Sequence, residues 1–264
     1  MALKLFEHPL SPYAQKVKIA LCEKALPFVR VFVDPNRSGD DPVYQEFVLA
    51  SPRREVPALV DGTVRLADST VILEYLDERY PKPELAPPTP AERARVRMLE
   101  EMMDTEYEAV NWGITEVKVF ARASGQDAAR LLTRASLQLQ RLWNRLEREL
   151  EGRRFMNGAE FGRGDAAVHP HLAQSQALGH PLSDLHPRLL DWEQRVAGRS
   201  SIKRVVNESA EFLRDQRTQA DGETPRLVRQ YRDHRLEWMM KTGGAGIVAR
   251  GLAERTIRFA EEYE

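Results

Sequence analysis

Hydrophobic and polar positions change their spacing along the chain, and the first 80 residues alternate between two kinds of segment. Residues 3–6 and 28–33 alternate as strands do, whereas residues 12–25 and 69–80 carry apolar side chains at helical spacing. A short helix is expected over 43–49. A hairpin is expected after Val56, turning at Asp61-Gly62. The order βαβαββα predicts a compact α/β unit with a mixed sheet.

The pattern changes at residues 81–91, which are rich in proline and have no periodicity, so we expect a linker there. Apolar residues then recur every three or four positions, which predicts an all-helical bundle over residues 92–215. The chain is therefore expected to form an α/β domain over 1–80, the linker, the helical domain and a charged helical extension over 216–264.

Within the extension, residues 226–240 are expected to form a helix with Leu227, Tyr231 and Leu236 nearly on one side. A glycine-rich break follows, from Thr242 to Gly246. It has no Gly-Lys-Ser/Thr sequence after it, so it indicates a hinge and not a phosphate-binding loop.

Composition narrows the classes of function. The net charge of −1 gives no reason to expect a nucleic acid or a membrane surface as partner. The single cysteine excludes an internal disulfide and a cysteine metal cluster. No apolar run is long enough for a signal peptide or a transmembrane helix, so a cytoplasmic location is expected.

Four segments, in order, resemble the cytosolic glutathione transferase family over about residues 3–215. They are SPYAQKVKIAL, VPALVDG, ADSTVILEYLDERYP and PRLLDWEQRVAGRSSIKRV. A fifth, FGRGDAAVHPHL, resembles the structural motif of the family's helical domain, with Gly162 at the cap position and Asp165 three residues later. The resemblance implies a thioredoxin-like α/β domain followed by a helical domain, with glutathione as co-substrate.

The resemblance assigns the catalytic role to Ser11, at the start of the predicted helix over 12–25. Unpaired N–H groups and the helix dipole favour negative charge there. A donating hydroxyl would stabilise the glutathione thiolate, whose thiol has an ordinary pKa of about 8.5. Serine is also a common helix cap, and both roles fit this position. Tyr13 offers a second hydroxyl and is expected to form part of the pocket wall.

The resemblance also implies a set of glutathione-binding positions. Val56 would pair through its backbone with the cysteinyl part, before a cis Pro57, and Asp68 and Ser69 would hold the γ-glutamyl end. Position 55, commonly Lys or Gln in the family, is Glu55 here and would repel the glycyl carboxylate. A neighbouring arginine, Arg53 or Arg54, could compensate, because a guanidinium suits a carboxylate.

The pocket for a hydrophobic electrophile is expected to use Tyr13, Tyr107 and Trp112, although large apolar residues at helical spacing are more often plain core. A serine cannot form the mixed disulfide of thiol reductases, so Ser11 favours conjugation of the kind used in detoxification, dehalogenation, ether cleavage or isomerisation. The alternative function is a non-catalytic binding or regulatory protein of the same fold. A homodimer is implied by the resemblance, and no metal is expected.

Overall fold

A four-stranded mixed sheet forms the beginning of the chain. In the computed structural model, which describes residues 2–34, 41–218 and 228–259, the strands are β1 (Leu3–Glu7), β2 (Phe28–Phe32), β3 (Ala58–Asp61) and β4 (Val64–Ala67). Their order is β2-β1-β3-β4. β1 and β2 are parallel, while β3 is antiparallel to both β1 and β4. The predicted hairpin is confirmed, with Gly62 at φ +61° in its turn.

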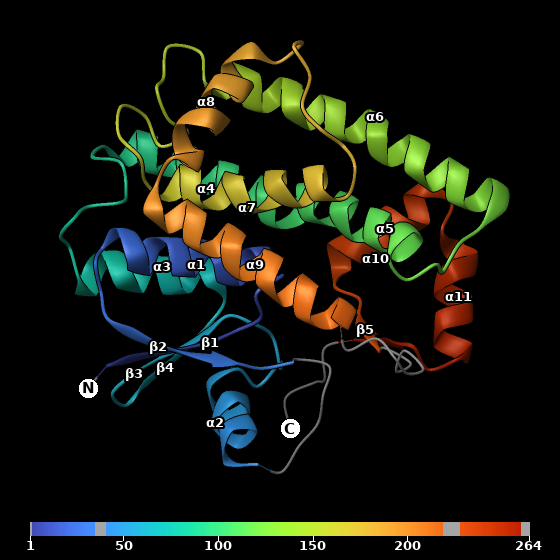
Figure 1. The fold of residues 1–264 in the computed structure, drawn as a ribbon, viewed down its shortest axis with the longest axis horizontal. Helices are drawn as coiled ribbons and strands as arrows, with labels where there is room; N and C mark the ends of the chain where they lie inside the picture. Colours follow the sequence, from blue (N-terminus) through green and yellow to red (C-terminus); the bar gives the residue numbers. More distant parts are fainter. Residues whose placement is uncertain (1, 35–40, 219–227, 260–264) are drawn as a thin grey trace.

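Helices cover both faces of this sheet (Figure 1). α1 (Pro12–Glu23) and α3 (Ser69–Arg79) lie on the face toward the rest of the molecule, and α2 (Pro42–Ala50) lies on the other. Successive residues of β1 point to opposite faces, so Leu5 packs in the core under α1 and α3 while Phe6 packs with α2. The predicted thioredoxin-like fold class is confirmed.

A helical bundle packs against α1. Its elements are α4 (Pro90–Met102), the π-helical turn η1 (Met103–Tyr107), α5 (Glu108–Lys118), α6 (Gly125–Glu149), α7 (Arg163–Ala177), α8 (Pro187–Ala197) and α9 (Ser200–Thr218). α7 is buried along its first ten residues and contacts α1. At its start, the Asp165 carboxylate accepts bonds from the N–H groups of Gly162 and Met156 and from the Trp192 indole. This carboxylate thus fixes the chain's entry into the central helix.

Within the described residues, the predicted helix over 226–240 begins only at Asp233. Residues 226 and 227 lie outside the described residues. Arg229–Gln230 form strand β5, which pairs in parallel with β6 (Ile257–Arg258). α10 (Asp233–Thr242) begins after it. The Tyr231 N–H donates to the Arg258 carbonyl at 2.8 Å, so the backbone here is satisfied by a strand partner instead of a helix.

The glycine-rich segment ends α10 and starts α11 (Ala245–Ala253). Gly243 adopts a left-handed conformation with φ +90°, which a residue with a side chain rarely takes. Figure 1 shows α10 and α11 beside the end of the bundle that α5 and α6 form. Among the described residues, no helix is both long and apolar enough to cross a membrane. The predicted domain boundaries at 80, 92 and 215 stay a prediction.

Candidate functional site

The register of the sheet brings three predicted site segments to the same end of its strands. Ala58 of β3 pairs with Phe6 of β1 on one side and with Ala67 of β4 on the other. The turn after β1, the segment before β3 and the start of α3 therefore leave the sheet at the same end. These segments hold Ser11, Val56–Pro57 and Asp68–Ser69, respectively.

Ser11 lies at the N-cap of α1, as the sequence predicted. Its backbone is extended, with φ −83° and ψ 114°, and its hydroxyl oxygen accepts a bond from the Ala14 N–H at 3.3 Å. Pro12 occupies the first helical position, where a missing N–H costs nothing. Accepting this bond leaves the serine O–H proton available to donate, since a hydroxyl can do both.

The segment before β3 has a cis peptide bond between Val56 and Pro57, as expected. Glu55 directly precedes it, and the Glu55 carboxylate lies 3.3 Å from the Arg53 guanidinium. The other predicted neighbour, Arg54, has φ +54°, and its carbonyl accepts a bond from Arg258 at 3.5 Å. Of the two arginines considered for compensation, Arg53 thus contacts Glu55 directly.

Asp68 is the N-cap of α3. Its carboxylate accepts bonds from the N–H groups of Thr70 and Val71, at 2.9 and 3.2 Å, and its φ of +74° is unusual for a non-glycine residue. Ser69 follows as a buried first residue of the helix. Capping is therefore visible for Asp68, and contact with a ligand remains a prediction.

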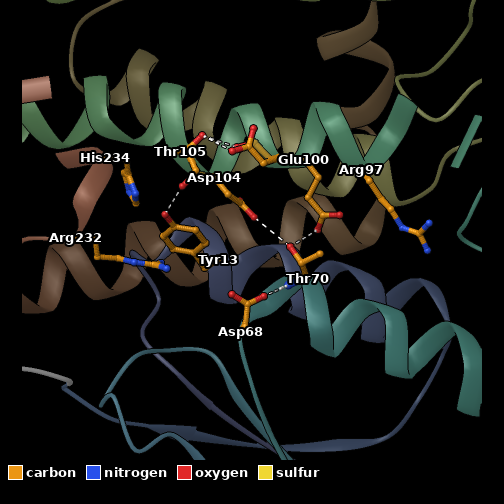
Figure 2. Close-up of a pocket in the computed structure, with 10 residues that line it drawn as sticks. Tyr13, Asp68, Thr70, Arg97, Glu100, Asp104, Thr105, Arg232 and His234 are labelled. Atoms are coloured by element: carbon orange, nitrogen blue, oxygen red, sulfur yellow. Dashed lines mark hydrogen bonds between the residues drawn. The ribbon is translucent and has the colours of Figure 1, made fainter. Parts of the chain in front are cut away.

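A pocket of about 260 Å³ opens beside Asp68 and Tyr13 (Figure 2). Only these two of its lining residues belong to the set predicted from the sequence. The others are Thr70, Arg97, Glu100, Glu101, Asp104, Thr105, Arg232 and His234. Every lining side chain carries a polar or charged group, so the pocket suits a polar ligand more than an apolar one.

Tyr13 is held in place by η1. Its hydroxyl donates to the Asp104 carbonyl at 2.6 Å. Burial, together with the nearby carboxylates of Glu108 and Asp104, raises the pKa of Tyr13 well above its ordinary value of 10.0. This hydroxyl is neutral and already engaged, which agrees with a wall position and disfavours a role in activating a thiol.

Tyr107 does not line this pocket, contrary to the sequence prediction. Its side chain is fully buried in the bundle core, and its oxygen contacts the Ser175 hydroxyl at 2.9 Å and accepts from the Trp143 indole at 2.8 Å. The helical spacing that placed Tyr107 on an inward face was correct, but that face packs inside the bundle. Tyr107 is a core residue.

Trp112 is covered by the C-terminal extension. The guanidinium groups of Arg229 and Arg235 lie 3.6 and 3.8 Å from its ring centroid, and the Tyr231 ring packs edge-on at 5.7 Å. The predicted electrophile residues Tyr13, Tyr107 and Trp112 therefore do not surround one open cavity. The extension takes the place at Trp112 where a hydrophobic ligand was expected.

Sequence reasoning missed Arg232 and His234 as pocket residues, because a charged segment past the resembling region gave no sign of its docking site. Within the described ranges, no three His, Cys, Asp or Glu side chains form a group able to hold a metal ion.

Comparisons with known proteins agree with this fold. Residues 5–84 match the family described as "Glutathione S-transferase, N-terminal domain". The chain is 28% identical over 217 residues to a stringent starvation protein A homolog from Coxiella burnetii, covering 81% of this chain and 95% of that protein. It is 39% identical over 99 residues to a probable maleylacetoacetate isomerase from Vibrio cholerae, covering 38% and 46%.

Solved structures show the same architecture. A glutathione S-transferase from Rhodospirillum rubrum F11 aligns with a TM-score of 0.68 at 27% identity, covering 77% of this chain and 91% of that one. A glutathione S-transferase from Methylobacterium radiotolerans, solved in complex with glutathione sulfonate, aligns with a TM-score of 0.65 at 26% identity, covering 78% and 95%.

Proposed function

Because the chain belongs to the glutathione transferase family by its N-terminal domain and its fold, we propose that it binds glutathione and activates the thiol through Ser11. The reaction is then attack of the bound thiolate on an electrophilic co-substrate. In this proposal glutathione is the co-substrate, and the attack of its thiolate uses no metal.

One observation carries this proposal. Ala58 pairs with both Phe6 and Ala67, so Ser11, the cis Val56–Pro57 bond and the start of α3 lie at the same end of the sheet's strands. A tripeptide along that end of the sheet would meet the backbone of Val56 before the cis bond and the first turns of two helices. Helix N-termini favour the thiolate at one point and the γ-glutamyl carboxylate at the other.

Several reactions are compatible with a serine-activated thiolate. The choice among conjugation, dehalogenation, ether cleavage and isomerisation depends on the co-substrate. The polar lining of the pocket favours a co-substrate with charged or hydrogen-bonding groups over the purely hydrophobic electrophile expected from the sequence. Two relatives carry the name maleylacetoacetate isomerase, one from Vibrio cholerae and one from Mus musculus, and this keeps isomerisation among the candidates.

Calorimetric titration with reduced glutathione, together with the ultraviolet absorbance of the bound thiolate against pH, tests this proposal. We expect the wild-type protein to bind, and Asp68→Ala to weaken binding by about tenfold through loss of a charged partner. Ser11→Ala should still bind, but the pKa of the bound thiol should return toward about 8.5. Ser11→Thr keeps the hydroxyl and should preserve the lowered pKa.

A matched control is Ser124→Ala, since Ser124 is the N-cap of α6 and forms no side-chain cap bond. It should leave binding and thiol pKa unchanged. Absence of heat from the wild-type protein at millimolar glutathione would contradict the proposal.

A second candidate is a non-catalytic binding protein of this fold. The observation that favours it is the covered Trp112, because Arg229, Tyr231 and Arg235 lie where a hydrophobic co-substrate was expected to bind. The two candidates differ in the Ser11→Ala experiment: a protein that only binds glutathione would hold it as the thiol, with no lowered pKa to lose.

A further inference from the structure

The pocket beside Tyr13 contains more acidic than basic groups, and most of these groups are already paired. Glu100 contacts the Lys16 ammonium at 2.8 Å and the Arg163 guanidinium at 3.0 Å. Asp104 contacts the same lysine, and Asp68 caps α3. A ligand with carboxylates, such as glutathione, therefore depends on the cations that the pocket offers.

Three cationic or potentially cationic side chains line the pocket, and two of them have close acidic partners. Arg97 donates to the Glu74 carboxylate at 2.8 Å, and His234 lies 2.9 Å from the Glu108 carboxylate. The third is Arg232, whose nearest carboxylate in the described part of the chain is Glu55, at 3.6 Å. That separation is too long for a hydrogen bond.

Arg232 is nevertheless held in a defined place. It is the N-cap of α10, and the residues on both sides of it in the chain are anchored. Gln230 donates to the Glu55 carboxylate at 3.0 Å, and Arg235 forms three contacts of 2.6 to 3.1 Å with Glu108. In Figure 2 the Arg232 side chain points across the pocket toward Tyr13, above Asp68. Its guanidinium carbon lies 5.9 Å from the Tyr13 ring centroid.

We propose that Arg232, supplied by the C-terminal extension, binds the glycyl carboxylate of glutathione. This inference rests on the proposed function. If Asp68 and Ser69 hold the γ-glutamyl end and Val56 pairs with the cysteinyl part, the glycyl carboxylate is the group still without a partner. It would lie toward Glu55, where an acid has replaced a favourable residue, and Arg232 is the pocket cation beside Glu55. A guanidinium is suited to such a carboxylate because it donates two parallel hydrogen bonds.

The glycyl monoethyl ester of glutathione isolates this interaction, because it keeps the tripeptide and removes only the glycyl negative charge. We would titrate glutathione and this ester into the wild-type protein, Arg232→Gln and Arg232→Lys. Lys241→Gln is the matched control, because Lys241 is an exposed cation on the same helix that pairs with Glu237. Thermal unfolding of each variant would confirm that the fold is retained.

We expect the wild-type protein to bind glutathione about tenfold or more tighter than the ester, the range of a hydrogen bond to a charged group. Arg232→Gln should lose the preference and bind glutathione no more tightly than the ester. Arg232→Lys should restore part of the preference, and Lys241→Gln should behave as wild type.

The outcomes that overturn the inference are distinct from failure of the proposed function. A preference for glutathione that survives in Arg232→Gln would exclude the contact. Equal weakening of both ligands would mean that Arg232 acts elsewhere, on the γ-glutamyl carboxylate or on the position of the extension. Binding of neither ligand by the wild-type protein would remove the proposed function itself.

Discussion

At the scale of single residues, three hydroxyl groups near the predicted site have different neighbours and therefore different uses. The Ser11 hydroxyl accepts one long bond from the Ala14 N–H and can still donate. The Tyr13 hydroxyl donates to the Asp104 carbonyl, and the Tyr107 hydroxyl is enclosed between Ser175 and Trp143. Ser11 is the one of the three that suits a thiolate.

Tyr107→Phe separates a core role from a pocket role. The change removes the oxygen that the buried Trp143 indole N–H donates to, so it should lower the free energy of unfolding by about 1–3 kcal/mol. Glutathione affinity should not change, because Tyr107 is absent from the pocket lining. Urea unfolding measures the stability and calorimetry measures the affinity. Weakened glutathione binding at unchanged stability would instead indicate that Tyr107 contributes to the pocket.

At the scale of elements, the C-terminal extension is docked on α5 by packing and by charge. Trp238 of α10 lies against Gly113, and Arg235 with His234 contacts the Glu108 carboxylate. Just before α10, the Tyr231 hydroxyl donates to the buried Glu116 carboxylate at 2.9 Å. These contacts hold the segment that carries Arg232 over the pocket.

Gly113→Ala tests the packing of Trp238 against α5. A Cβ at this position would overlap the buried Trp238 ring, so either the extension undocks or the fold loses about 1–3 kcal/mol. Gly246→Ala is the control, because a Cβ there meets nothing within 4 Å. It should leave stability unchanged or raise it by about 0.5–1 kcal/mol. Thermal unfolding with limited proteolysis of residues 228–259 reports both effects, and a Gly113→Ala protein as stable and resistant as the control would contradict this packing.

The contacts of Glu108 with Arg235 and His234 predict that the stability of the fold depends on pH. Burial by itself would raise the pKa of the Glu108 carboxyl, but the Arg235 guanidinium and His234 hold that pKa well below its ordinary value of 4.5. A lowered folded pKa means that Glu108 stabilises the fold fully above about pH 4.5 and loses this effect as the pH falls through the folded value. Urea unfolding at several pH values should show the stability gap between wild type and Glu108→Gln narrowing only below that point. A gap that is constant down to pH 3 would show that the ion pair does not contribute.

At the scale of the whole molecule, buried charges join the sheet layer to the bundle. Lys16 of α1 contacts Glu100 of α4 and Asp104 of η1. Burial lowers the pKa of the Lys16 ammonium, but these two carboxylates outweigh it and raise that pKa overall. The same network orders the acidic side of the pocket, so the junction between the two parts and the site share residues.

Lys16→Met should therefore destabilise the protein by about 3–5 kcal/mol, because it removes the ammonium shared by two largely buried carboxylates, of which Glu100 keeps its contact with Arg163. Lys4→Met is the matched control. The Lys4 pair with Glu46 is about one third exposed, and its loss should cost less than about 1 kcal/mol. Denaturant unfolding distinguishes the two, and equal costs for both variants would show that the buried network contributes no more than a surface pair.

The sequence by itself determined the fold class and much of the local structure. Alternation with period two and apolar spacing of three to four reflect which face of a strand or helix is buried, and this information is local. The hairpin at Asp61-Gly62 and the cap at Ser11 depend on residues within four positions of one another. Neighbouring residues were sufficient to predict them.

Only the tertiary structure decided what each buried face contacts. Helical spacing placed Tyr107 on an inward face but could not say that this face meets Ser175 and Trp143. One partner of Glu55 is Gln230, 175 positions away, and no periodicity connects two such residues. A strand pair at β5 and β6 turned a segment with a helix-like pattern into the support for Arg232, because long-range packing outweighs local preference.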